Sequence, residues 1–247
     1  MKRVVLIAIL FFPPLLLAAW VLFGANLMRN MASDPNRKSI AERLLEYGPA
    51  SRARLKPLFE TAKIAYPPAR LALVGLKSEK QLQVYASAEN QPFAFITSIP
   101  ILAASGKPGP KLREGDEQVP EGIYPIELLN PNSKFHLALR LGYPNQFDRE
   151  QARKEGRENL GGDIMIHGGA ASVGCLAIGD QAIEDLFVLA ADTGFDRITV
   201  ILSPVDFRNP DAKVETNSLP AWSGELYAGI KSKLRELPVP ANPAKSP

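Results

Sequence analysis

The chain has 247 residues, a formal net charge of +3, 46% hydrophobic residues and 22 prolines. This length is enough for one domain with a sizeable core together with a membrane segment. The small positive charge, without a basic run interleaved with aromatic residues, argues against a nucleic-acid-binding protein and is compatible with an anionic polymer as partner.

Residues 1–25 predict a membrane anchor or a signal segment. Lys2 and Arg3 precede an apolar run from Val4 to Phe23, and a helix of about 20 residues spans about 30 Å, the thickness of the hydrocarbon core. A cleaved signal peptide is the alternative, but Phe23-Gly24-Ala25 is a poor cleavage site. We therefore expect an uncleaved inner-membrane anchor at residues 4–23, with the rest of the chain on the periplasmic side.

Residues 26–69 predict a helical spacer. Apolar side chains recur every three to four positions between Ser39 and Ala65, and Gly48-Pro49 interrupts the pattern. This arrangement predicts two short helices that carry no chemistry.

Residues 70–205 predict a mainly β domain with flanking helices. Short alternating or apolar runs between turns predict strands at Leu71–Leu76, Gln81–Ala86, Phe93–Ile99, Gly122–Leu129, Phe135–Leu141, Asp163–His167 and Arg197–Leu202. The first three runs predict consecutive antiparallel strands, and many short strands with turn-rich connections favour a two-layer sandwich or a closed barrel. The charged stretch 148–162 predicts a solvated loop or a short surface helix, with a lid over a site as the alternative.

Two helices are expected near the C-terminus. Apolar residues at helical spacing predict one helix that starts near Asp180, which would be its N-cap. Residues 206–247 predict a second helix from Glu225 to Leu237, followed by a proline-rich, disordered tail from Pro238.

The stretch from Ile164 to Ile178 has the features of a catalytic site. It contains Cys175, the single cysteine, and His167, one of two histidines, with three glycines between the flanking apolar runs. A thiolate is a strong nucleophile, and an imidazole can take its proton and return it to a leaving group. The alternative, an inert buried thiol, fits poorly with a loop of Gly, Ala and Ser. Two histidines and one cysteine at this spacing match no zinc site, so neither a metal nor a cofactor is predicted.

The same stretch resembles a known family. His167-Gly168, a loop of small residues and Ser172-Val173-Gly174-Cys175 are similar to the signature of the L,D-transpeptidase (YkuD-type) catalytic domain family, and the resemblance is closest to the YafK branch. Further segments similar to that branch are Ser105–Asp116, Pro120–Tyr124, Leu129–His136 and Leu141–Asn145. The resemblance covers about Leu71 to Pro204. Many members of the wider family have His and Arg where this chain has Val173 and Leu176.

The resemblance implies an L,D-transpeptidase-like β fold and acyl transfer on the peptide stems of peptidoglycan. Cys175 is then the nucleophile that forms a thioacyl-enzyme, His167 is the base, and the carbonyl of Gly168 holds the imidazole. We expect the backbone N–H groups of Gly174 and Cys175 to stabilise the oxyanion. The substrate-binding candidates are Ser172, Gly174, His136 and Arg140, whereas Lys111 and Arg113 are candidates by charge alone.

Two other functions stay open at this point. A hydrolase of the same fold would use Cys175 and His167 in the same way, with water as the acceptor, and would cleave wall links or release a wall-linked protein. A non-catalytic wall-binding module would have an unreactive thiol.

Overall fold

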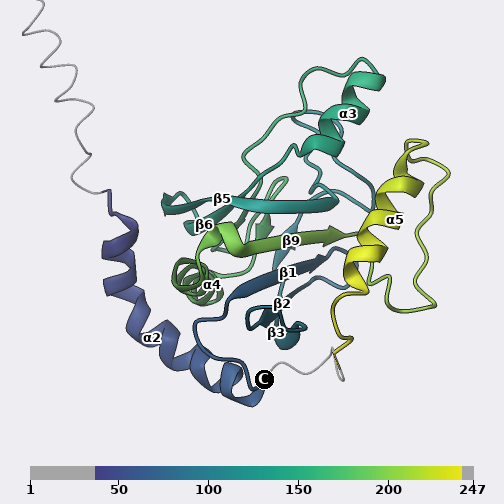
Figure 1. Cartoon of the computed structure of the whole chain (residues 1–247). Coiled ribbons are helices and arrows are strands. Elements are labelled where there is room, and N and C mark those ends of the chain that lie inside the picture. Colours follow the sequence, from purple (N-terminus) through teal and green to yellow (C-terminus); the bar gives the residue numbers. More distant parts are fainter. Residues whose placement is uncertain (1–36, 241–247) are drawn as a thin grey trace, which may run out of the picture. The chain divides into compact units, whose positions relative to one another are not determined.

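The computed structural model describes residues 37–240 (Figure 1). The predicted membrane segment at residues 4–23 and the tail beyond Pro240 lie outside this range. Within residues 37–240, none of the helices combines the length and the hydropathy needed to cross a membrane.

The described strands form one mixed sheet in the order β3-β2-β1-β9-β5-β6-β7-β8-β4. Their bounds are Arg70–Leu76 (β1), Gln81–Ser87 (β2), Ala94–Pro100 (β3), Ala103–Ala104 (β4), Gly122–Ser133 (β5), His136–Leu141 (β6), Met165–His167 (β7), Leu176–Ala177 (β8) and Ile198–Ser203 (β9). Two of the pairs, β1 with β9 and β7 with β8, are parallel. The expected antiparallel order of the first three strands is confirmed, and the sheet is mixed because β9 enters its middle after a helix and pairs in parallel with β1.

The two end strands of this sheet are close neighbours in the sequence. Strand β3 ends at Pro100 and β4 begins at Ala103, so only Ile101 and Leu102 connect strands at opposite ends of the order. The sheet must therefore curl back toward itself, as strands in a barrel do, although β3 and β4 do not pair. Leu102 N–H donates to Ala177 O at 2.8 Å and fixes this connection to β8.

The central strand β1 is buried on both faces of the sheet. Leu71 and Leu73 face one apolar core together with helix α4, Asp180–Thr193. The alternate residues Ala72 and Val74 face a second core with helix α5, Ser223–Leu234. Burial on both faces explains why this strand reads as a continuous apolar run. Figure 1 shows β1 beside β9, with α4 to the left of these strands and α5 to their right.

The predicted spacer is one helix, α2, which runs from Ile40 to Thr61 and includes Pro49 and Pro57. The expected break at Gly48-Pro49 was therefore wrong. A proline inside a helix costs about 3 kcal/mol, and tertiary contacts offset this cost: Phe59 is buried in the first core, and two bidentate Arg–Asp pairs join α2 to α4. These pairs are Arg52 with Asp192 and Arg54 with Asp185.

Two further elements refine the expectations. The charged stretch contains a short helix, α3, Gln146–Lys154, which begins with a capping box between Asn145 and Asp148. Helix α4 has Gly179 as its N-cap, and Asp180 is its first residue. The side chain of Asp180 accepts a hydrogen bond from Gly169 N–H at 2.7 Å instead, so the predicted cap ties the cysteine loop to the helix.

Candidate active site

His167 and Cys175 lie at two paired parallel strands, two register positions apart. His167 is the last residue of β7, and Cys175 directly precedes β8. The register pairs Ile166 with Leu176 and His167 with Ala177. The loop between the strands is therefore held at both ends, and the sheet brings the two reactive residues together.

Both side chains line one cavity of about 500 Å³, a volume within the range of small-molecule sites. The hairpin between β5 and β6 and the cysteine loop supply its walls. The remaining lining residues are Asn130, Asn132, Ser133, Lys134, Phe135, Asp163, Met165, Ala171, Ser172 and Val173.

The imidazole of His167 is buried and held on two sides. Its Nδ1 lies 2.7 Å from the carbonyl oxygen of Gly168, and the ring of Phe135 stacks on it at 4.6 Å between centroids. Burial lowers the pKa of His167, and the hydrogen bond with Gly168 acts in the opposite direction. The ring is therefore biased toward the neutral form, in which Nδ1 donates to Gly168 O and Nε2 has a free lone pair.

The thiol of Cys175 is also biased toward its neutral form. Burial raises its pKa, and the hydrogen bond that Met165 N–H donates to Sγ at 3.4 Å acts against this. Sγ lies 3.6 Å from the carbonyl oxygen of Asp163, which can accept a hydrogen bond from the thiol. Among the described contacts, no hydrogen bond joins Sγ to His167. Both shifts favour a thiol and a neutral imidazole over a preformed ion pair in the resting structure.

The two backbone donors expected for an oxyanion both have partners. Gly174 N–H donates to Ser105 Oγ at 2.5 Å, and Cys175 N–H donates to Ser172 Oγ at 3.1 Å. A hydroxyl thus covers each donor in the resting structure. Either N–H group can stabilise an oxyanion only after its hydrogen bond to the serine hydroxyl breaks.

The other predicted residues differ in whether they line the cavity that contains the thiol. Ser172 lines the cavity with Cys175, whereas His136 does not: its Nε2 lies 2.9 Å from Glu184 on α4. Arg140 is also absent from the lining, and its guanidinium is 3.7 Å from the carboxylate of Asp163. Neither side chain lines the cavity, since His136 contacts α4 and Arg140 reaches only Asp163 at its wall.

A second, smaller cavity of about 160 Å³ meets Cys175 from another side. Asp163, Val173 and Cys175 line both cavities. Lys111 lines the smaller one, where it forms an ion pair of 2.5 Å with Asp116, whereas Arg113 lines a different hollow. Sequence reasoning missed Phe135, Asp163 and Val173 as site residues. The aromatic Phe135 in a polar turn was the one available signal.

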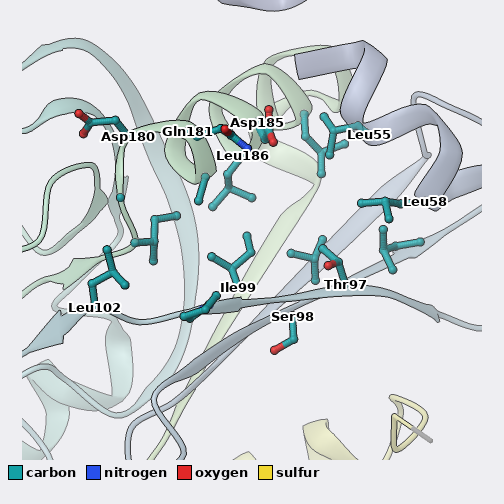
Figure 2. A pocket seen from close by; sticks show the side chains of 17 residues that line it. Leu55, Leu58, Thr97, Ser98, Ile99, Leu102, Asp180, Gln181, Asp185 and Leu186 are labelled. Atoms are coloured by element: carbon teal, nitrogen blue, oxygen red, sulfur yellow. The ribbon is translucent and has the colours of Figure 1, made fainter. Parts of the chain in front are cut away.

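Another cavity, of about 440 Å³, lies away from Cys175 between α2, β3 and α4 (Figure 2). Leucine and isoleucine side chains such as Leu55, Ile99 and Leu186 form most of it. Its carboxylates are already engaged, Asp185 with Arg54 and Asp180 with Gly169 N–H. No cysteine or histidine is among the described residues that line this cavity, and it is not part of the candidate active site. In residues 37–240, no group of three or more His, Cys, Asp or Glu side chains could hold a metal ion.

Comparison with known proteins gives a relative for about half of the chain. Over 144 residues the chain is 34% identical to "Putative L,D-transpeptidase YafK" of Escherichia coli K12, covering 56% of this chain and 55% of that protein. The O157:H7 strain has a counterpart with the same values. The chain thus spans about half the length of the curated relatives it matches. No protein-family model matches the chain.

Solved structures give weaker likenesses. The helical cell shape determining protein Pgp2 of Campylobacter jejuni is 23% identical, with a TM-score of 0.45 over 55% of this chain and 48% of that one. L,D-transpeptidase 1 of Mycobacterium tuberculosis is 14% identical, with a TM-score of 0.32 over 54% of this chain and 62% of that one. The match to YafK supports an L,D-transpeptidase-like family for the part of the chain that it covers.

Proposed function

We propose that the chain is a cysteine acyltransferase of the L,D-transpeptidase type, acting on peptide stems of peptidoglycan. The observation that supports it best is that His167 and Cys175 line one 500 Å³ cavity while a second cavity meets the same thiol. An acyl donor and an acceptor must both reach one sulfur atom, and two cavities provide the two approaches.

The reaction then follows from the resting geometry. His167 takes the thiol proton at Nε2 as Sγ attacks the amide carbonyl of a stem, and Gly168 O holds the resulting imidazolium through Nδ1–H. The imidazolium then protonates the leaving amine, which leaves a thioacyl-enzyme. An acceptor amine attacks the thioester, His167 removes its proton, and the thiol is regenerated.

Binding of the oxyanion is the step that requires the resting structure to rearrange. Gly174 N–H and Cys175 N–H would leave Ser105 and Ser172 to bind it. A hydrogen bond to a charged oxygen is about twice as strong as one to a neutral hydroxyl. The exchange therefore favours the transition state over the resting state.

A hydrolase of the same fold is the second candidate, and the size of the smaller cavity favours it. This cavity has about a third of the volume of the one that His167 and Cys175 share, and water needs less room there than a second peptide stem does. Water would then take the acyl group, and the substrate would be a wall cross-link or a wall-linked protein.

The site would work in the cell envelope. The apolar run at residues 4–23, preceded by Lys2 and Arg3, would anchor the chain in the inner membrane with the catalytic domain on the periplasmic side.

Incubation of the full chain, in detergent, with purified tetrapeptide-stem muropeptides tests the proposal. Mass spectrometry reads the products, with Cys175→Ala and His167→Gln as controls. We expect a cross-linked or amine-exchanged product that both variants lose. Release of a stem residue or a linked peptide without a new bond identifies the hydrolase. Absence of any product, with a thiol that resists alkylation, leaves the binding module.

A further inference from the structure

We propose that the tip of the β5–β6 hairpin, Ser133–His136, positions the base of the reaction, and that helix α2 takes part in this through Tyr47. The proposal rests on the proposed function, since it assigns His167 as the base. It makes Phe135 and His136 positioning residues and gives the predicted spacer a role in the active site.

The first contact is the stack of Phe135 on His167. The two rings are 4.6 Å apart at an interplanar angle of 26°. Phe135 is 46% exposed, whereas His167 is 2% exposed. The phenyl ring therefore covers the imidazole on the side of the cavity, limits its rotation and keeps water from its face.

The second contact lies at the acceptor that orients the imidazole. A Cβ atom on Gly168 would lie 2.7 Å from Phe135 O and 3.0 Å from His136 Cβ. Only glycine therefore allows the hairpin tip to approach so closely. Gly168 N–H also donates to Leu137 O at 3.2 Å. The tip thus packs against both the ring of His167 and the residue that binds its Nδ1.

The third observation is that the tip is held in an uncommon conformation. His136 has a φ of +73°, in the left-handed region that non-glycine residues seldom occupy. Such a residue persists where its surroundings fix it. Here Nε2 lies 2.9 Å from Glu184 Oε1, and the ring of Tyr47 packs edge-on at 5.2 Å.

These two anchors lie on helices that are tied together. Tyr47 is on α2 and Glu184 is on α4, and Arg54 of α2 lies 3.8 Å from Glu184 and 2.6 Å from Asp185. A change in α2 can therefore reach His167 through His136 and Phe135. The series of contacts predicts that Tyr47 and Phe135 act on the same property of the base.

The test uses the full chain in detergent and measures the alkylation rate of Cys175 by iodoacetamide as a function of pH. This reaction reports the coupling of the thiol to His167 and needs no wall substrate, so it is separate from the proposed function. The variants are Tyr47→Leu, Phe135→Leu and the double variant, with Tyr47→Phe as the conservative replacement. Leu45→Ala is the matched control, because Leu45 lies on the same helix and is 80% exposed.

We expect Phe135→Leu to slow alkylation at neutral pH about tenfold and Tyr47→Leu about fivefold, with the double variant no slower than Phe135→Leu. Both replacements also admit water to His167, which raises the pKa of the imidazole. The inflection of the pH profile that disappears in His167→Gln therefore moves to higher pH. Tyr47→Phe and Leu45→Ala keep the wild-type profile. Muropeptide turnover, where the chain shows it, falls in kcat with little change in KM.

The opposite results are equally clear. Unchanged profiles in variants that unfold at the wild-type temperature would overturn the proposal. So would additive losses in the double variant, which would mean that the two residues act separately. If Tyr47→Leu does not fold, Glu184→Gln replaces it, with an expected slowing of about threefold. If His167→Gln leaves the wild-type pH profile unchanged, His167 does not act as the base, and this result contradicts the proposed function as well.

Discussion

Ser105 Oγ accepts a hydrogen bond from Gly174 N–H at 2.5 Å, although 69 positions separate the two residues. The same hydroxyl donates to Glu117 O at 2.5 Å. Ser105 therefore links the loop between β4 and β5 to the cysteine loop and covers a backbone donor that would bind the oxyanion in the proposed reaction. Its two hydrogen bonds give it opposite effects on stability and on rate.

Ser105→Ala is expected to lower the stability of the fold and to speed up acylation. Two hydrogen bonds at about 1 kcal/mol each are lost, so the free energy of unfolding falls by about 2 kcal/mol. A Gly174 N–H group that no longer binds a hydroxyl raises the acylation rate by about fivefold, the equivalent of about 1 kcal/mol. Urea unfolding measures the first effect, and the time course of thioacyl-enzyme formation by intact mass measures the second.

The exposed Ser218 provides a control for Ser105, and Ser218→Ala is expected to change neither quantity. An acylation rate that drops tenfold in Ser105→Ala would contradict the interpretation. That result would mean that the hydroxyl holds the loop in its reactive shape and that another group binds the oxyanion.

The extent to which the sequence predicted the fold depended on how local each signal was. The runs at Leu71–Leu76 and Gln81–Ala86 became β1 and β2 with bounds within one residue, because their apolar patterns are set by burial. The two-residue strands β4 and β8 have no pattern of their own and exist through pairing, β4 with β8 and β8 also with β7. The continuity of helix α2 through Pro49 was not predicted, because contacts with α4 outweigh the local effect of that proline.

The candidate site followed the same rule. Cys175, His167 and the carbonyl of Gly168 lie within ten residues of sequence, so a local motif was enough to bring them forward as candidates. Ser105 and Phe135 reach the same site from connections that are distant in sequence, and only Phe135, as an aromatic residue in a polar turn, carried a local signal. His136 lay in a segment that matched the family, but its side chain points to Glu184. Sequence proximity to a motif does not give side-chain direction.

The pH dependence of thiol alkylation in the native chain is expected to lie above that of the same thiol in the urea-unfolded chain. Burial raises the pKa of Cys175 above the ordinary value of 9.0, so less thiolate is present at neutral pH in the folded state. In terms of linkage, the neutral thiol favours the fold below pH 9, and this contribution is lost as the pH rises through the folded pKa. A native midpoint at or below the unfolded one would contradict a buried, neutral thiol.

Asp148 is expected to make the chain less stable as the pH rises from 4 to 7. Burial raises the pKa of this carboxyl from 3.8 to about 6, so the folded state holds its proton longer than the unfolded state does. The stabilising contribution is complete below about pH 4 and is lost as the pH passes through about 6. At about 1.4 kcal/mol per pKa unit, the loss is about 3 kcal/mol.

Asp148→Asn keeps the side-chain shape at the start of α3 and removes the titration. Urea unfolding at pH 4, 5, 6 and 7 should show a flatter profile for this variant than for the wild type. Asp211→Asn, at an exposed position, should leave the profile unchanged. Equal slopes for the wild type and Asp148→Asn would mean that the carboxyl titrates at its ordinary pKa in the folded chain.

The loop that carries the smaller cavity is fixed by a buried ion pair, and breaking one side of it should cost more than removing both charges. Lys77 Nζ lies 3.0 Å from Glu121 Oε1, with side chains 6% and 0% exposed. The ammonium also donates to the carbonyls of Lys107, Gly109 and Val119. Lys77→Met alone leaves a buried carboxylate without its cation and is expected to lower the free energy of unfolding by about 3–5 kcal/mol.

The double variant Lys77→Met, Glu121→Gln separates the charge from the packing. The amide keeps one oxygen for Gly109 N–H or Tyr227 O–H, both of which Glu121 accepts in the native chain at 2.7 and 2.8 Å, and it carries no charge. We expect it to recover about half of the loss in urea unfolding, since an unpaired buried charge costs more than an imperfectly paired amide. A double variant less stable than Lys77→Met would show instead that Glu121 finds compensation without Lys77, and that the hydrogen bonds to the loop carbonyls hold residues 107–119 in place.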